Sequence, residues 1–336
     1  MGKRKVIKEI LEGKKPPYVP WHLNFTIEAE EKLKIYWDSK DIEDRFGNHF
    51  LELDNFDKNF KKIGENLYKD YFGAVWDRSI DKDIGNVLDI ILKEPKLTGY
   101  DFPNPLNNVF FEDIPKKIEK YPDRFRVFHI GFSLYERAWI LRGMENLLTD
   151  MIINPRFVRN LFGCITDYNI EQVKKVLTYD IDGIFFGDDW GMQVGLQMGY
   201  RLWREFIYPE INRMYKVVKD KGKFVCIHCC GDVDELFDEL IEIGLDLFNP
   251  FQPEVMDVYS LLNKYRGRLS FHGGMSTQKV LPFYNTEDVR EETKKLIEAG
   301  KEGSYIFAPA HAVKGDVPIE NTLVFIEELQ KQEGFL

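Results

Sequence analysis

The chain has 336 residues and a formal net charge of -10, with 44% hydrophobic and 30% charged residues. This composition excludes disordered, collagenous and low-complexity proteins, and an acidic surface disfavours binding to the phosphate backbone of nucleic acids. No segment approaches the ~20 consecutive apolar residues of a membrane span, and the charged N-terminal segment does not resemble a signal peptide, so we expect a cytoplasmic protein without a membrane partner.

Short β-type segments alternate with helical segments along most of the chain. Eight strands are predicted over residues 18–24, 49–54, 125–131, 183–188, 224–230, 245–250, 269–274 and 304–311. Helical periodicity predicts helices over residues 144–177, 203–221, 233–243 and 286–298. This alternation predicts a parallel sheet, and eight strands can close such a sheet into a (β/α)8 TIM barrel.

The remaining segments are interpreted around this α/β barrel. An N-terminal extension precedes it, and residues 70–101 are predicted to be an inserted irregular segment with a hairpin near residues 74–78. No linker or repeat marks a boundary, so residues 1–336 are predicted to form a single domain. The alternative is an open doubly wound sheet, which is disfavoured because no glycine-rich phosphate-binding loop follows a predicted strand.

Polar side chains gather where the predicted strands end. The active site of a parallel barrel lies at the C-terminal ends of its strands. The candidates there are His22, Asp188, Asp189, His228, Cys230, Asn249, Gln252, His272 and His311. This set is richer in metal ligands and acid–base groups than a packed core requires, whereas His49 and His129 are expected to be structural.

The segment around His228 gives the most specific signal. Side chains alternate across a strand, so Cys226, His228 and Cys230 share one face, while the apolar Val225 and Ile227 take the other. A thiolate and an imidazole two residues apart supply half of a zinc site, and a catalytic site adds a third protein ligand. The candidates for that ligand are His311 and His272, as nitrogen donors, and Asp188 and Asp189, as oxygen donors.

Structural interpretations compete with these roles. Free cysteines are commonly small buried side chains, which is the interpretation favoured for Cys164, Cys226 and Cys229. Asp188 and Asp189 could instead be helix N-caps. His228 with Cys230 is interpreted as a metal site because both residues lie at the end of one strand.

From about residue 3 to residue 328 the sequence resembles the uroporphyrinogen decarboxylase superfamily. The matching stretches are residues 17–24, 187–190, 228–232, 271–274, 308–311 and 317–321. The resemblance implies a (β/α)8 barrel, in agreement with the strand count. The superfamily contains metal-free decarboxylases of haem synthesis and zinc-dependent methyltransferases that work with methylated corrinoids.

Two motifs separate these branches. The decarboxylases carry paired arginines near the N-terminus, but this chain has no arginine between Arg4 and Arg45. The methyltransferases carry an H-x-C-G motif, which residues 228–231 match, and an A-P-G-C motif, where residues 308–311 read A-P-A-H. The resemblance therefore implies His311 as the third zinc ligand, although the decarboxylases also have a histidine near this point.

The leading hypothesis is a zinc-dependent methyltransferase that moves a methyl group between a corrinoid and a thiol or similar acceptor. Zinc would be held by His228, Cys230 and His311, with Asp189 and His311 as catalytic residues. Substrate contacts are predicted for Asp188, His272, Asn249 and His22. The methylcorrinoid would be a substrate or be carried by a partner protein, and a homodimer is compatible with the sequence. The alternatives are a metal-free decarboxylase that uses Asp189 and His311, and a non-catalytic corrinoid- or tetrapyrrole-binding protein.

Overall fold

The computed structural model describes residues 2–53 and 59–335, and its largest sheet has seven parallel strands. The strands are β1 (Phe50–Glu52), β6 (Phe125–Ile130), β7 (Gly183–Gly187), β8 (Phe224–His228), β9 (Leu247–Phe251), β10 (Ser270–Met275) and β11 (Tyr305–Pro309), paired in that order. Seven of the eight predicted strands are thus confirmed. The strand predicted at residues 49–54 is shorter, and its last residue lies outside the described part of the chain.

The predicted strand at residues 18–24 does not form a regular strand. Trp21 makes only an isolated bridge to Phe307 of β11, supported by a His22 N to Phe307 O hydrogen bond of 3.0 Å. On the other side, His49 N donates to Trp21 O at 3.1 Å, just before β1. Pro20 has no N–H to donate, which interrupts the ladder. The fold is therefore an α/β fold with a curled seven-stranded parallel sheet, one strand short of the predicted barrel.

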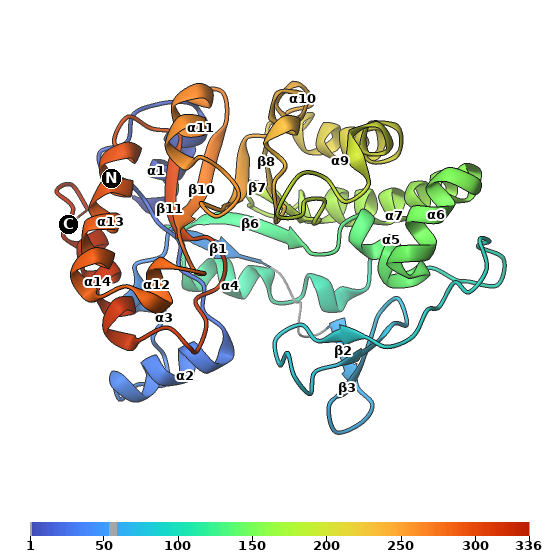
Figure 1. Cartoon of the computed structure of the whole chain (residues 1–336), viewed down its shortest axis with the longest axis horizontal. Helices are drawn as coiled ribbons and strands as arrows, with labels where there is room; N and C mark the ends of the chain where they lie inside the picture. Colours follow the sequence, from blue (N-terminus) through green and yellow to red (C-terminus); the bar gives the residue numbers. More distant parts are fainter. Residues whose placement is uncertain (1, 54–58, 336) are drawn as a thin grey trace.

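Helices surround the strands in Figure 1. They are α2 (Ile27–Tyr36), α3 (Glu43–Phe46), α4 (Ile114–Lys120), α5 (Tyr135–Arg142), α6 (Met144–Ile153), α7 (Pro155–Val176), α8 (Gly199–Leu202), α9 (Tyr208–Lys219), α10 (Phe237–Glu242), α11 (Val258–Tyr265), α12 (Val280–Phe283), α13 (Thr286–Gly300) and α14 (Ile319–Gln330). The 3-10 turns η2 (Asn108–Phe110) and η4 (Asp234–Leu236) and the π turn η3 (Trp203–Ile207) complete the set. The helix predicted over residues 144–177 is divided at Pro155, which begins α7 because it lacks an N–H. No helix in the described ranges has the length and apolar character needed to span a bilayer.

Helix α1 (Lys3–Leu11) packs on the inner face of the sheet near the beginnings of the strands. Its Ile7 and Ile10 join an apolar cluster with Phe50, Phe125, Val127, Phe185, Cys226, Leu247 and Ile306. Arg4 Nε donates to Asp182 Oδ2 at 2.8 Å, which ties the helix to the loop before β7. The N-terminal half of the sheet's inner face is therefore filled with apolar side chains, and polar groups are confined to its C-terminal half.

The inserted segment is more regular than predicted. Together with residues 60–69, which precede the predicted insertion, it forms an antiparallel sheet of β2 (Phe60–Lys62), β3 (Leu67–Asp70), β4 (Val75–Asp77) and β5 (Asn86–Val87), which stands to one side of the parallel sheet in Figure 1. The predicted hairpin corresponds to β3 and β4. The buried Asp70 carboxylate binds Arg137 of α5 at 2.6 Å and Trp76 Nε1 at 3.2 Å, which fixes this sheet beside the helix.

Candidate functional site

Along each of four strands, the side chains on the inner face of the parallel sheet change from apolar to polar over two residues. Side chains two residues apart point to the same face. The pairs are Phe50 and Glu52 on β1, Val127 and His129 on β6, Cys226 and His228 on β8, and Leu247 and Asn249 on β9. In each pair the first side chain lies in the apolar cluster, and the second lines a cavity at the C-terminal end of the sheet.

This inner cavity has a volume of about 370 Å³. It is lined by five of the six histidines of the chain: His22, His129, His228, His272 and His311. Three carboxyl groups, those of Glu52, Glu136 and Asp189, also line it, together with Asn249 and apolar residues such as Phe132 and Phe185. Among the described lining residues there is no lysine and no arginine.

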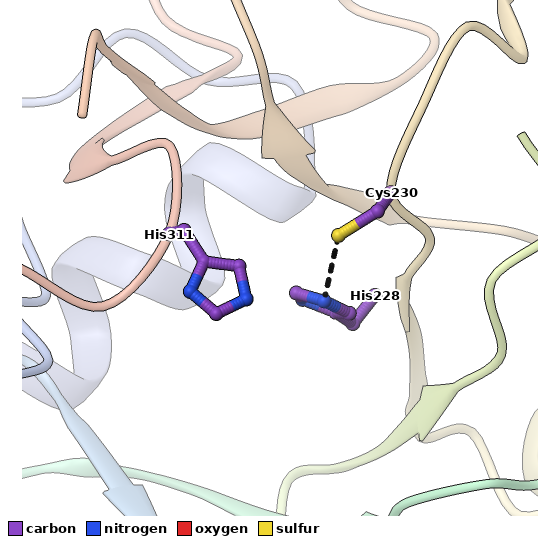
Figure 2. Close-up of side chains that lie close together, drawn as sticks. All are labelled: His228, Cys230 and His311. Carbon is purple, nitrogen blue, oxygen red and sulfur yellow. Dashed lines mark hydrogen bonds between the residues drawn. The ribbon is translucent and has the colours of Figure 1, made fainter. Parts of the chain in front are cut away.

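Three side chains with metal-binding atoms converge at this site. His228 ends β8, Cys230 follows it in the next loop, and His311 follows β11. Ligand atoms of the three residues all lie within 4.8 Å of one another, and Cys230 Sγ lies 3.3 Å from His228 Nε2. Figure 2 shows the two imidazole rings and the thiol facing a common space. His311 thus lies next to the two side chains, His228 and Cys230, that were predicted to share one face.

A hydrogen-bond network sets the orientation of the His228 ring. Asn249 Oδ1 lies 2.7 Å from His228 Nδ1, and because an amide oxygen can only accept, Nδ1 carries the proton. Asn249 Nδ2 donates to His272 O at 3.0 Å, which fixes the amide. The lone pair of His228 Nε2 is consequently directed toward Cys230. Such a partner on the second ring nitrogen is the usual companion of a metal-ligating histidine.

The loop that carries Cys230 is held against the loop after β7. Cys230 N donates to Asp189 Oδ1 at 2.7 Å, and Gly231 has a φ of 91°. A Cβ at Gly231 would lie 2.4 Å from the carbonyl carbon of Gly191, so only glycine permits this approach. Burial raises the pKa of the Cys230 thiol, and the carboxylate of Asp189 raises it further. Ionisation of this thiol near neutral pH therefore requires a nearby cation.

Asp188 and Asp189 have different positions although they are adjacent. The buried Asp188 carboxylate accepts hydrogen bonds from Tyr135 N at 3.0 Å, Glu136 N at 2.8 Å and Trp190 Nε1 at 2.5 Å. Asp188 thereby binds the first turn of α5 and is not among the residues that line the inner cavity, where a substrate contact was predicted. Burial raises the pKa of Asp188 to about 6, although these hydrogen bonds oppose the shift. Asp189 does line the cavity, with Oδ1 4.0 Å from His228 Nε2.

His22, Asn249 and His272 line the cavity, and their predicted contacts with a substrate stay a prediction. His272 is 4% exposed, and its Nε2 has no hydrogen-bond partner within the described structure. Burial, together with the neighbouring His22, lowers the pKa of His272 to about 3, so this ring is neutral near pH 7. His22 Nε2 lies 3.4 Å from Glu52 Oε1.

Three titratable residues of the cavity lining were not among the predicted site residues. The alternation of β1 predicts the position of Glu52, which lies two residues after Phe50 on the same face. Burial disfavours its ionised form, but the adjacent His22 and the other nearby histidines outweigh burial and lower the pKa of Glu52 to about 2. Glu136 depends on where α5 begins, which the sequence pattern did not show; burial and the nearby Asp189 raise its pKa. His129 was expected to be structural, yet it lines the cavity.

The trio formed by His228, Cys230 and His311 also borders a second space. This outer cavity of about 480 Å³ is lined by Cys230, His311 and Lys314, among others. His311 lines both cavities, whereas His228 lines only the inner one and Cys230 only the outer one. Two molecules could therefore approach the trio from different sides.

Comparisons with known proteins agree with this architecture. The sequence profile of the family described as Uroporphyrinogen decarboxylase (URO-D) matches residues 137–332. A uroporphyrinogen decarboxylase from Campylobacter concisus (strain 13826) is 21% identical over 186 residues, which are 54% of this chain and 51% of that protein. The match thus spans about half the length of this curated relative.

Two solved structures share the fold. A methyltransferase from Methanosarcina mazei superposes with a TM-score of 0.75 at 15% identity, covering 98% of this chain and 99% of that one. A B12-independent methionine synthase from Shewanella sp. W3-18-1 gives a TM-score of 0.51 at 11% identity, covering 94% and 93% of the two chains. At these identities the similarity establishes a common fold.

Proposed function

The chain belongs to the uroporphyrinogen decarboxylase family, and we propose that it is a zinc-dependent methyltransferase that moves a methyl group between a corrinoid and a thiol or similar acceptor. The observation that carries the proposal is the convergence of one sulfur and two imidazole ligands within 4.8 Å. The fold shared with a methyltransferase is compatible with it.

The donor set of the trio fits zinc. One thiolate and two imidazoles are typical zinc ligands, and three protein ligands leave the fourth position open, as in catalytic sites. The 3.3 Å between Cys230 Sγ and His228 Nε2 is close to the roughly 3.5 Å expected between two ligands of a tetrahedral zinc. When bound, zinc would supply a positive charge that lowers the pKa of an acceptor thiol, so that its thiolate is available as the nucleophile.

The surrounding residues then have defined roles in the proposed reaction. Asn249 holds the His228 ring through its 2.7 Å hydrogen bond, and Asp189 positions Cys230 through the Cys230 backbone N–H. Asp189 is also the proposed base for the proton of the acceptor thiol. The acceptor would occupy the inner cavity, and the corrinoid, free or carried by a partner protein, would approach from the outer cavity. The methyl group moves to sulfur, and the electron pair of the broken cobalt–carbon bond stays on cobalt.

Purified protein is expected to contain about one equivalent of zinc per chain, because the trio supplies a single ligand set. Elemental analysis measures this directly. In the presence of a thiol, the zinc-loaded protein should demethylate methylcobalamin, which is followed by absorbance, and the chelated protein should not. Folded, metal-free protein that transfers the methyl group at the same rate would contradict the proposal.

A metal-free decarboxylase is the second candidate, favoured by the description of the matching family and by Asp189 and His311, which both line the inner cavity. We expect no conversion of uroporphyrinogen to coproporphyrinogen. A polycarboxylate substrate needs fixed cations, yet no arginine lies between Arg4 and Arg45, and the described residues around the inner cavity include neither lysine nor arginine. A product assay with uroporphyrinogen tests this expectation, and turnover at ordinary enzymatic rates would favour the decarboxylase.

A further inference from the structure

The inner cavity contains a second polar centre, formed by Glu52 and His22. Glu52 lies on β1 and His22 on the segment beside it, whereas His228 lies on β8. In the sheet, β1 and β8 are separated by β6 and β7. The His22 ring is buried against Glu52 Oε1 at 3.4 Å, and 35% of the Glu52 side chain remains exposed. Because Glu52, His228 and His311 line the same cavity, a ligand of matching length meets the trio with one group and Glu52 with another.

The ionisable side chains that line the inner cavity are carboxyl groups and histidines. Glu52, Asp189 and Glu136 line it, but burial and the nearby Asp189 raise the pKa of Glu136 and so favour its neutral form. Within the described ranges no lysine or arginine lines the cavity. Lys314 lines the outer cavity and is not among the residues that line the inner one. His272 stays neutral near pH 7, because burial lowers its pKa to about 3, and so adds no positive charge. The carboxylate of Glu52 therefore has no lysine or arginine beside it in the described lining, and a carboxylate in a partly dehydrated cavity attracts a cation and repels an anion.

We propose that the acceptor carries an ammonium group, and that Glu52, backed by His22, binds this group while the nucleophilic sulfur of the acceptor lies at the trio. This inference rests on the proposed function, since it names the class of its substrate: a small aminothiol rather than an anionic thiol. The ammonium N–H groups donate to the Glu52 carboxylate, and charge-assisted hydrogen bonds of this kind are stronger than neutral ones. The cavity volume of about 370 Å³ accommodates a small acceptor of this kind.

Three thiols with the same HS–CH2–CH2 unit test the proposal. Cysteamine ends in an ammonium group, 2-mercaptoethanol in a hydroxyl and 2-mercaptoethanesulfonate in an anion. Calorimetric titration of the zinc-loaded protein should show cysteamine binding about tenfold or more tightly than the sulfonate. In Glu52→Gln, cysteamine should bind about tenfold more weakly, and the affinity for 2-mercaptoethanol should stay within about twofold.

Two further variants serve as controls. Glu302 lies in the loop before β11, at the opposite end of the strands, and its exposed carboxylate pairs with Lys15. Glu302→Gln should therefore keep the full preference for cysteamine over the sulfonate. Glu52→Asp keeps the charge and should retain most of the preference, so it decides the question if Glu52→Gln does not fold. Equal affinities for all three thiols, or an unchanged preference in Glu52→Gln, would overturn the proposal.

The zinc titration separates this inference from the proposed function. If the protein does not bind zinc, the proposed function fails, and the charge preference is measured on the metal-free protein with the same three compounds. If the protein binds zinc and all three thiols equally well, the proposed function stands and the ammonium site fails.

Discussion

Cys230→Ala is expected to lose zinc and to keep its fold. The substitution removes the single thiolate of the trio and leaves two imidazoles. Removing a residue that only hydrogen-bonds to a metal ligand lowers metal affinity by about 10- to 100-fold. Removing the ligand Cys230 itself should therefore lower zinc affinity by more than about 100-fold. Cys230 lies in a loop at the end of the sheet, whereas the apolar cluster that stabilises the sheet lies at the other end of the strands. Competition with a chromophoric chelator measures the affinity, and thermal unfolding reports the fold.

The neighbouring Cys229 provides a matched control. Its side chain is fully buried on the opposite face, where its sulfur lies 3.3 Å from Trp190 N. Cys229→Ala should therefore bind zinc like the parent chain but unfold more easily, by about 1 kcal/mol for a small buried side chain. The unfolding comparison uses metal-free proteins, since bound zinc itself stabilises the folded state. Global unfolding of metal-free Cys230→Ala would instead identify a structural site, and unchanged zinc affinity would exclude Cys230 as a ligand.

The strand pattern predicted the part of the site that depends on local periodicity. Alternation along residues 224–230 placed His228 and Cys230 on one face before any tertiary contact was known, and Cys226 on that face lies in the inner apolar cluster as expected. The same rule applied to residues 49–54 would have identified Glu52. The alternation works here because each strand is buried on both faces, so that its register is fixed.

Features that depend on distant contacts were not predictable in this way. Asp188 and Asp189 are adjacent, and only the position of α5, about fifty residues earlier in the chain, directs Asp188 to the helix and leaves Asp189 in the cavity. The segment at residues 18–24 has a strand-like sequence, but Pro20 and the side chain of Asn48, which accepts from Leu23 N at 2.8 Å, divert its backbone hydrogen bonds. The antiparallel sheet of residues 60–87 has strands of two to four residues, too short for a periodic signal.

His311 decides between the two roles that the sequence left open, zinc ligand and acid–base group. The His311 ring centroid lies 6.0 Å from that of His228, and the side chain borders both cavities. Cysteine can replace histidine as a zinc ligand but not as a proton carrier near neutral pH. His311→Cys should therefore keep zinc, whereas His311→Ala should bind it about 100-fold more weakly, as measured by chelator competition.

The position of His311 in the trio makes ligation the expected outcome. An acid–base residue could be lost without any change in zinc affinity, so the alanine variant separates the two roles even when both variants are inactive. If His311→Ala binds zinc as tightly as the parent chain, the third ligand lies elsewhere. Asp189, whose Oδ1 is 4.0 Å from His228 Nε2, is then the first residue to replace, and His272, whose Nε2 has no partner in the described structure, is the second.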